Sequence, residues 1–376
     1  MTKSTDVIVI GAGIIGAACA WRLAQAGLRV RILERNAPGS QASQAALGVL
    51  TFHADPEKPA CFQDLFIGSK QLYLDLIEEL AEVAGERINF HQGGQLHIAL
   101  NEKDLPGIES FYNVNSDKSV NVEWVSPEEC LLLEPGVAPH ICGGIFFPED
   151  AWVDNTALTL GIIRAAEQAG AVLERANVEA IESQKGRATG VRWGGERRAA
   201  GWIILAAGCW SGQIQNVPSI PIAPVRGQAL SVAGRAARRV IMSPNGYLVP
   251  KGEAQTMVGA TVEYVGFDDS NTLEGLREVS TSGLEISPHI GAFEFLGAWA
   301  GLRPGTTDNM PLIGPFTELP NLLAATGHFR NGILLAPITA QMIRAVVTGE
   351  LSSADLSPFL PDRNSSTKPG EHLPSK

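Results

Sequence analysis

The chain has 376 residues, which at about 150 residues per domain allows two or three domains or one large two-domain enzyme. Apolar residues make up 45% and charged residues 18%, so the composition excludes a disordered or coiled-coil chain. The net charge of −11 argues against nucleic acid and anionic membranes as partners, because both bind clustered positive charge. Glycine accounts for 40 of the 376 residues, a larger share than the roughly 7% of an average protein. This excess indicates many tight backbone approaches.

The first residues predict a strand, a helix and a second strand. Residues 6–10 form an apolar run, residues 14–26 have a helical pattern that stops at Gly27, and residues 28–33 are apolar again. The run 7–20 also resembles a secretory signal peptide, since it ends in a small-residue triplet. Asp6 and the glycine spacing favour the strand and loop instead.

Three glycines, Gly11, Gly13 and Gly16, join the first strand to the helix in the pattern G-x-G-x-x-G. The first glycine permits a sharp turn, the second lets the backbone approach a pyrophosphate, and the third packs helix against strand. Ile14 and Ile15 begin the helix, whose N–H groups and positive dipole end favour phosphate. The pattern predicts a dinucleotide-binding loop.

An acidic residue ends the second strand, as this type of fold requires. Glu34 lies 18 residues after Gly16 and is followed by Arg35, which we include in the site. A carboxylate at this place accepts the hydroxyls of an adenosine ribose and repels a 2′-phosphate. The sequence therefore predicts an adenine dinucleotide other than NADP.

The remaining elements alternate between two kinds of pattern. They are, in chain order, a small-residue loop at 39–48, an amphipathic helix at 69–84, short strands between 88 and 146, a helix at 155–169, strands at 171–173 and 203–207, strand-like segments from 220 to 300, a strand at 321–325 and a helix at 333–347. Helix–strand character thus returns three times, which predicts one discontinuous nucleotide-binding domain interleaved with a second sheet domain.

The boundaries follow from these changes of pattern. The nucleotide-binding domain is predicted at 1–87, 147–219 and 301–362, the second domain at 88–146 and 220–300, and a disordered polar tail at 363–376.

The five cysteines contain no C-x-x-C pair and are odd in number, which is typical of reduced thiols. We therefore expect a cytoplasmic protein without an integral membrane segment.

Two further chemistries are disfavoured. His91 and His97 have no carboxylate or cysteine at ligand spacing, so we expect surface or turn histidines and no metal site. The segment 208–212 contains Ser211 but lacks the G-x-S-x-G spacing of a serine hydrolase.

The loop 39–48 has two possible roles. It could lie against a flat ring, with Ser43 bonding phosphate or ring, or it could simply be a packing loop.

Five blocks of the chain, taken together, resemble the D-amino-acid oxidase superfamily of FAD-dependent amine oxidases, and within it the bacterial glycine oxidases of thiamine biosynthesis. The blocks are the glycine-rich start, Ala42–Gly48, Ile204–Gly208, Trp299–Gly305 and Gly327–Ile333. The resemblance spans residues 6 to 350. It implies an α/β fold with a discontinuous Rossmann-like FAD-binding domain of the glutathione-reductase type and an antiparallel-sheet substrate domain.

The resemblance implies FAD as the cofactor. Residues 311–326 contain no cysteine, so we expect FAD to be held without a covalent bond. The resemblance places Val178 against adenine. The full set of expected FAD contacts is Gly11, Gly13, Ile14, Ile15, Gly16, Glu34, Arg35, Ser43, Gln44, Ala45, Ala46, Gly48, Val49, Val178, Ala207, Gly208, Trp210, Arg303, His328, Arg330, Asn331, Gly332 and Ile333.

The resemblance also assigns the catalytic residues. Arg303 matches the family's substrate arginine, whose planar guanidinium binds a carboxylate in a two-pronged geometry. Tyr247 matches a tyrosine that adds a hydroxyl to the same carboxylate. Arg330 is expected to face either the substrate or the protein.

The implied activity is oxidative deamination of glycine, sarcosine or small D-amino acids, with hydride transfer from Cα and oxygen as the electron acceptor. Close glycine oxidases generally differ at Leu47, Val49, Asn245 and Val262, which leaves the preferred amine open. The alternatives are a dehydrogenase that passes electrons to a quinone or protein, and a non-catalytic flavoprotein. We expect a homo-oligomer.

Overall fold

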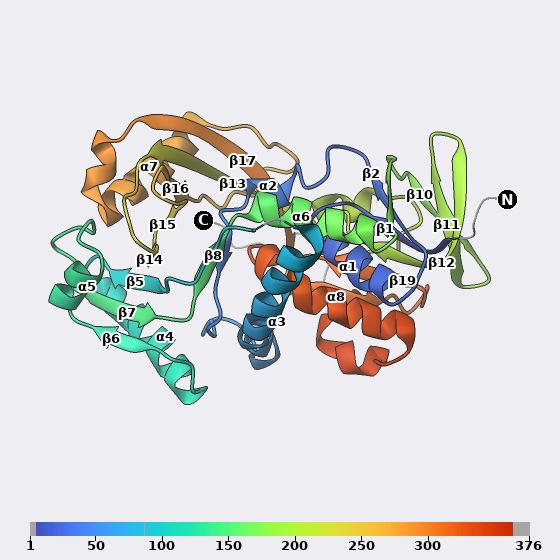
Figure 1. Cartoon of the computed structure of the whole chain (residues 1–376), viewed down its shortest axis with the longest axis horizontal. Coiled ribbons are helices and arrows are strands. Elements are labelled where there is room, and N and C mark those ends of the chain that lie inside the picture. The colour runs from blue at the N-terminus through green and yellow to red at the C-terminus, as the bar shows by residue number, and fades with distance from the viewer. Residues whose placement is uncertain (1–4, 86, 364–376) are drawn as a thin grey trace.

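The computed structural model describes residues 5–85 and 87–363. Two large sheets lie in opposite halves of the molecule, and a small three-stranded sheet lies near their junction (Figure 1). None of the helices in the described ranges is long and apolar enough to cross a membrane.

The first sheet combines a parallel centre with antiparallel edges. Its parallel strands run in the order β9-β2-β1-β12-β19, and β10, β11 and β18 pair in antiparallel fashion. Its strands are β1 (Thr5–Ile10), β2 (Val30–Glu34), β9 (Val172–Arg175), β10 (Ala180–Gln184), β11 (Arg187–Trp193), β12 (Glu196–Leu205), β18 (Leu312–Pro315) and β19 (Leu322–Thr326). The central strands are apolar throughout because both faces of this sheet are covered.

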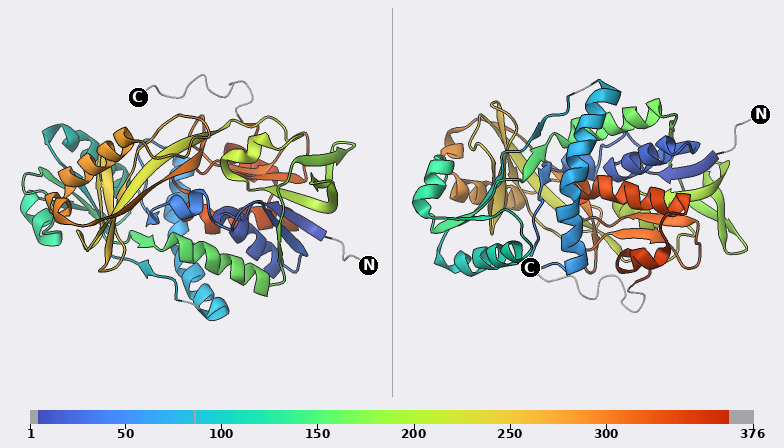
Figure 2. Two further views of the ribbon diagram at one scale, coloured as in Figure 1. Left: turned by 90° about the horizontal axis from the view of Figure 1, so that it is seen from above. Right: turned by 60° about the horizontal axis from the view of Figure 1, so that its bottom comes forward.

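Four helices cover one face of the first sheet. They are α1 (Ile14–Gln25), α3 (Ala60–Ala84), α6 (Asn155–Gln168) and α8 (Gly332–Thr348). Asp154 begins α6 by accepting hydrogen bonds from the N–H groups of Thr156 and Ala157, as a helix N-cap does. Figure 2 shows the long α3 running across the start of α8, where the Tyr73 hydroxyl donates to the Ile333 carbonyl.

The second sheet has the strand order β17-β13-β16-β15-β14-β5-β7-β6. Its strands are β5 (Gln95–Ala99), β6 (Glu123–Val125), β7 (Gly143–Phe147), β13 (Ile222–Ala233), β14 (Val240–Ser243), β15 (Gly246–Pro250), β16 (Gln255–Gly259) and β17 (Phe295–Thr306). Neighbours are antiparallel except β14 and β5, which are parallel. The parallel pair joins the two chain segments that build this sheet.

Three helices on this sheet were not predicted, because the sequence analysis expected strand-like segments there. They are α4 (Leu105–Asp117), α5 (Pro127–Leu133) and α7 (Leu273–Ile286). Two of them have a recognisable start: Ser126 and Glu129 form a capping box at α5, and Thr272 accepts from the Gly275 N–H at α7. These short polar signals lie between strands and were overlooked.

The remaining short elements complete the fold. They are α2 (Ala42–Ala45), η1 (Glu102–Asp104), η2 (Gly208–Gln213), η3 (Pro288–Ala292), η4 (Ser353–Phe359) and the three-stranded sheet of β3 (Val49–Leu50), β8 (Ala151–Val153) and β4 (Phe90–His91). The predicted domain boundaries stay a prediction. One boundary was predicted after residue 300, and β17 runs across that position without a break.

Arg363, the first residue of the predicted disordered tail, is ordered in the structure. The Arg363 guanidinium donates to the Asp308 carboxylate at 2.9 and 3.0 Å and to the Met310 carbonyl at 2.9 Å. Arg363 is therefore fixed against the loop before β18, because it pairs with a carboxylate that the sequence alone did not place nearby. Residues 364–376 lie outside the described residues.

Candidate active site

A cavity of about 880 Å³ lies between the two large sheets and is lined by residues from all five sequence blocks. Pockets for small molecules and cofactors measure roughly 300–1,000 Å³, so this cavity is at the large end of that range. It extends from the glycine-rich loop after β1 to the face of the second sheet. A long ligand that reaches both regions fits this shape.

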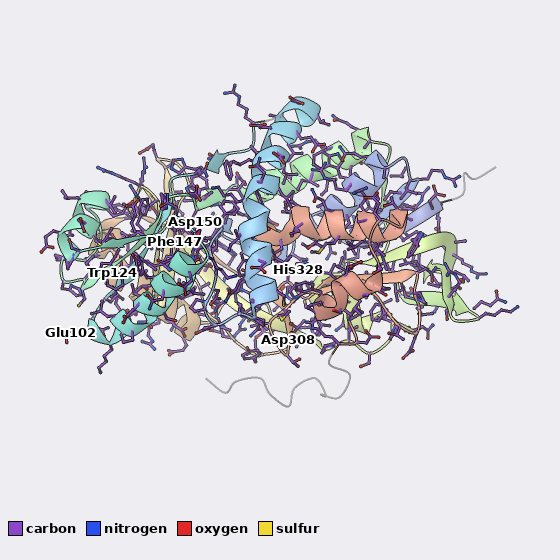
Figure 3. The ribbon with its side chains drawn as sticks, turned by 90° about the horizontal axis from the view of Figure 1, so that it is seen from below. Glu102, Trp124, Phe147, Asp150, Asp308 and His328 are labelled. Carbon is purple, nitrogen blue, oxygen red and sulfur yellow. The ribbon has the colours of Figure 1, made fainter. Side chains whose placement is uncertain are left out.

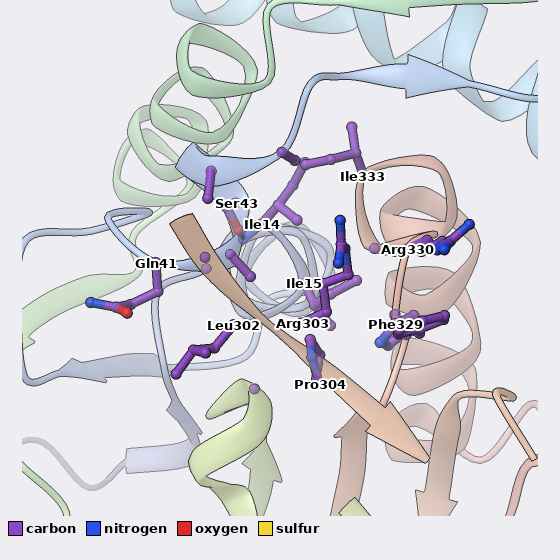
Figure 4. Close-up of a pocket in the computed structure, with 18 of the residues that line it drawn as sticks. Ile14, Ile15, Gln41, Ser43, Leu302, Arg303, Pro304, Phe329, Arg330 and Ile333 are labelled. Carbon is purple, nitrogen blue, oxygen red and sulfur yellow. Dashed lines mark hydrogen bonds between the residues drawn. The ribbon is translucent and has the colours of Figure 1, made fainter. Parts of the chain in front are cut away.

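The glycine-rich loop packs so tightly that side chains are excluded from two positions. A Cβ on Gly11, whose φ is 104°, would lie 2.5 Å from the Ala206 carbonyl oxygen, and one on Gly16 would lie 2.0 Å from the Gly11 oxygen. Beyond the loop, Ser43 Oγ accepts a 2.9 Å hydrogen bond from the Ile14 N–H (Figure 4). The hydroxyl therefore lies at the N-terminus of α1, where anions are favoured.

Glu34 is held at the cavity by the backbone. Its Oε2 accepts from the Ala12 N–H at 2.7 Å and its Oε1 from the Asn36 N–H at 2.8 Å. The Arg35 guanidinium lies 4.1 Å from the centre of the Trp210 ring, and both residues line the cavity. This end has the acceptor and the flat surface that an adenosine group needs.

The small-residue loop around α2 is fixed from three sides. Trp299 Nε1 donates to the Ala45 carbonyl at 2.9 Å, and Asn155 Nδ2 donates to the Ser43 carbonyl at 2.7 Å. A Cβ on Gly301 would lie 2.4 Å from the Ala45 Cβ. The loop and β17 therefore approach each other as closely as backbone allows, and both line the cavity.

Arg303 extends from β17 into the cavity (Figure 4). Its Nη1 donates to the Thr261 carbonyl at 3.0 Å and to the Arg226 carbonyl at 3.4 Å. Burial lowers the pKa of Arg303, the adjacent Tyr247 hydroxyl opposes that shift, and nearby Arg330 adds to it. Because a guanidinium keeps its proton in proteins and has five N–H donors, Arg303 offers a charged, anchored group to a ligand carboxylate.

The turn between β19 and α8 forms another wall. Gly327 and Phe329 both have positive φ, at 74° and 49°, and the Phe329 N–H donates to the Pro304 carbonyl at 3.0 Å. This bond ties the turn to β17. Arg330 is exposed, with its guanidinium 5.4 Å from the Phe329 ring centre, while it also borders the cavity. Asn331 and Gly332 then direct the N-terminus of α8 at the cavity.

His328 lies beneath this turn and is buried. Its Nε2 lies 2.9 Å from Thr339 Oγ1, and burial lowers the pKa of His328 to about 3. The ring is therefore neutral at physiological pH. Its Nδ1 has no hydrogen-bond partner among the described residues.

Comparison with known proteins identifies the family. The family described as "DAO: FAD dependent oxidoreductase" matches residues 6–345 of the chain. The chain belongs to this family. The DAO-family chain is 35% identical over 356 residues to a glycine oxidase from Bacillus licheniformis, with 93% of this chain and 94% of that protein covered. It is 32% identical over 369 residues to a glycine oxidase from Bacillus subtilis, with 96% and 98% covered.

Solved structures agree with the sequence comparison. Glycine oxidase from Geobacillus kaustophilus matches the DAO-family chain with a TM-score of 0.92 at 30% identity, covering 96% of this chain and 100% of that chain. Iminodiacetate oxidase from Chelativorans sp. BNC1 matches with a TM-score of 0.87 at 28% identity, covering 94% and 98%. The predicted α/β fold class and the amino-acid or amine oxidoreductase class are thereby confirmed.

FAD, held without a covalent bond, is the cofactor of this DAO-family protein. The cavity fits it at three places: the bare Gly11 turn and the N-terminus of α1 suit the pyrophosphate, Glu34 suits the ribose, and the small side chains of Ala45 and Ala46 line the cavity with little bulk beside a flat ring. In addition, the N-terminus of α8 faces the cavity, where its dipole favours negative charge.

The structure brings nearly all predicted site residues of the DAO-family protein to this one cavity. Those that line it are Gly11, Gly13, Ile14, Ile15, Glu34, Arg35, Ser43, Ala45, Ala46, Gly48, Val49, Val178, Ala207, Gly208, Trp210, Tyr247, Arg303, His328, Arg330, Asn331, Gly332 and Ile333. Gly16 is set back, in the contact between helix and strand. Their individual roles remain predictions.

Gln44 requires a correction. Its side chain is exposed and it does not line the cavity, although it was expected among the cofactor contacts. Its backbone explains why: the Gln44 N–H donates to the carbonyls of Gly39 and Gln41, and its own carbonyl accepts from Asn155. The backbone is satisfied within the protein, and the side chain points to solvent.

Sequence reasoning missed a buried group at the second-sheet end of the cavity. His97 was expected at the surface or in a turn, but it lies on β5, is only 8% exposed and lines the cavity. His91 is exposed and lies on a different strand, β4. His53 also lines the cavity and was not considered. Within the ranges that the structure describes, no three metal-ligating side chains come together.

Proposed function

We propose that this DAO-family protein is an oxidase of amino acids, acting on glycine, sarcosine or D-amino acids. The reaction removes a hydride from Cα and a proton from nitrogen, and water then converts the imine to a 2-oxo acid and ammonia or an amine. Oxygen accepts the two electrons and becomes hydrogen peroxide. The observation that carries the proposal is Arg303, a charged group anchored in the cavity beside Tyr247.

Each residue contributes orientation rather than proton transfer. Arg303 binds the substrate carboxylate through two N–H donors, and Tyr247 adds a hydroxyl to the same group. Two anchored carboxylate oxygens fix the position of Cα, and such positioning is a large part of the acceleration in reactions of this kind. When bound, FAD supplies the hydride acceptor. The N-terminus of α8 favours the negative charge that arrives with the hydride.

The identity of the preferred amine depends on the cavity lining. Leu47, Val49 and Asn245 all line the cavity, and these are positions at which the sequence departs from close glycine oxidases. The matched iminodiacetate oxidase acts, by its name, on a secondary amine. We therefore include secondary amines and larger D-amino acids among the substrates.

A panel of amines tests the proposal. Purified holoenzyme is supplied with glycine, sarcosine and D-amino acids of increasing length, and oxygen uptake and peroxide are measured. We expect oxygen uptake with at least one of these amines and an equal amount of peroxide. If an amine bleaches the flavin and reduces an artificial dye without oxygen uptake, the protein is a dehydrogenase and the oxidase proposal is wrong.

A further inference from the structure

His53 lines the cavity and is paired with Asp150, which does not. His53 Nδ1 lies 2.6 Å from Asp150 Oδ2, and their side chains are 1% and 2% exposed. The other oxygen, Asp150 Oδ1, accepts from the Phe52 N–H at 2.7 Å. Because this carboxylate accepts from both Phe52 and His53, it directs Nδ1 of the ring to Asp150 and leaves Nε2 as the ring atom available to a ligand.

Aromatic rings fix the orientation of this pair. The His53 ring stacks on Phe147 with centroids 3.6 Å apart and planes at 8°, and it contacts Phe111 edge-on at 6.0 Å. Figure 3 shows Phe147 and Asp150 beside each other in the half of the molecule that contains α4. The imidazole is therefore held in place before any ligand arrives.

His97 lies next to His53 and has an unsatisfied polar atom. The two rings are edge-on with centroids 5.0 Å apart, and His97 Nε2 is buried without a hydrogen-bond partner. Burial, and then the neighbouring His53, lower the pKa of His97 well below its usual value, so the ring is neutral. A buried nitrogen without a partner is destabilising, and a ligand with a matching group would offset that cost.

Sheet register places His97 on the same face as Tyr247. His97 on β5 pairs with Met242 on β14, and Met242 pairs with Tyr247 on β15. Strands are about 4.8 Å apart, so His97 lies roughly 10 Å along the sheet from Tyr247. Met242 lines the cavity between them. A substrate anchored at Tyr247 and Arg303 could extend over the apolar Met242 side chain to the histidines.

The charges at this end select against a second carboxylate. Asp55 and Glu57 follow His53 closely along the chain and also line the cavity, and Asp150 lies behind His53. His97 is neutral, so it offers a hydrogen bond but no positive charge. A hydroxyl or amide group on a ligand pairs with such polar atoms without bringing negative charge among carboxylates.

We propose that His53 and His97 form a distal subsite that hydrogen-bonds a polar, uncharged group, such as a hydroxyl or amide, at the end of the substrate side chain. The proposal rests on the proposed function, because the carboxylate must first be anchored at Arg303. With a hydrogen bond at each end of the roughly 10 Å interval, the ligand spans about 5–10 Å between its carboxylate and its polar end group. The substrate class is an amino acid with an apolar linker and a polar, uncharged end.

Carboxylic acids without an amine test binding separately from turnover. Dissociation constants for the holoenzyme are measured from the change in flavin absorbance with butanoate, hexanoate, their ω-hydroxy derivatives and adipate. One net hydrogen bond contributes about 0.5–1.5 kcal/mol, so we expect one ω-hydroxy acid to bind about twofold to tenfold tighter than its parent. Adipate should bind more weakly than hexanoate. Equal binding of hydroxy and parent acids would overturn the subsite.

Variants assign the preference to the histidine. His97→Leu should abolish the preference for the hydroxy acid while leaving butanoate binding unchanged, and His97→Gln, which keeps a donor and an acceptor, should retain it. His140→Leu, at an exposed histidine, is the control and should change neither. If His97→Leu keeps the preference, the subsite is wrong. If the wild type binds none of the acids, Arg303 does not anchor a carboxylate. The proposed function is then wrong, and so is the subsite that depends on it.

Discussion

The guanidinium of Arg303 packs against the bare backbone of Gly227 on the neighbouring strand. A Cβ on Gly227 would lie 2.2 Å from Arg303 Nη2 and 2.3 Å from Cζ and Nη1. Gly227 lies on β13, whose residue Val225 pairs with Arg303, so the side chain crosses diagonally over the partner strand. The absence of a side chain at Gly227 therefore fixes where the charge of Arg303 lies.

Gly227→Ala should impair catalysis more than folding. Its added methyl group meets the end of a flexible side chain, so the guanidinium moves and the strand does not. Displacing an anchoring group by about 1 Å can cost on the order of 100-fold in rate, and we expect a loss of this size in kcat/KM with nearly unchanged Tm. The control is Gly297→Ala on β17, where a Cβ meets nothing within 4 Å. Equal activity of both variants would show that the position of Arg303 does not depend on Gly227.

Gly16→Ala should release FAD. Its methyl group would lie 2.0 Å from the Gly11 carbonyl oxygen, which is backbone and cannot move without opening the turn. We expect loss of bound flavin and a lower Tm, measured by absorbance after dialysis and by thermal unfolding. Gly107→Ala, in α4 with nothing within 4 Å, is the matched control. It should raise helix stability by about 0.5–1 kcal/mol and keep the flavin. Retention of FAD by Gly16→Ala would contradict the assigned phosphate loop.

Glu34→Gln tests the adenosine end of the site. One amide oxygen replaces two carboxylate oxygens, so one of the bonds from the Ala12 and Asn36 N–H groups is lost together with the charge. The ribose hydroxyls also lose their charged acceptor. Since hydrogen bonds to charged groups contribute about 1.5–3 kcal/mol, we predict at least about tenfold weaker FAD binding in reconstitution titrations. Glu79→Gln, in a partly exposed ion pair with Arg22, should leave FAD affinity unchanged. A normal affinity in Glu34→Gln would remove Glu34 from the site.

The pH dependence of stability should show the burial of Lys251. Burial lowers its pKa from 10.5 to about 8, while its Nζ donates to the Val153 carbonyl at 2.7 Å. Between these two pKa values the unfolded chain binds more protons than the folded one, so the free energy of unfolding rises with pH across this window.

Thermal unfolding of wild type and Lys251→Met across that window checks the sign. We expect the wild-type Tm to rise with pH relative to the Tm of the variant, which lacks the titrating amine. Parallel curves for the two proteins would show that Lys251 titrates normally in the folded state.

The parts of this site that the sequence predicted are those encoded by short local patterns. Gly11, Glu34 and Arg303 each lie in a motif whose neighbours reveal its geometry. Gly227 could not be recognised in this way, because its role depends on the register of β13 against β17. His53 and Asp150 are 97 positions apart and meet only because β7 brings its following turn to the loop after β3. The helices that end at glycines were predicted. The helices α4, α5 and α7, which interrupt strand-rich segments, were missed.

The most direct test of the account compares oxygen uptake by Arg303→Lys and Arg303→Ala with that of the wild type, on the best amine of the panel and with FAD content verified. We predict that both variants lose at least about tenfold in kcat/KM, because an ammonium cannot reproduce a two-pronged bond to carboxylate. A wild-type value for Arg303→Lys would contradict the claim that guanidinium geometry positions the substrate.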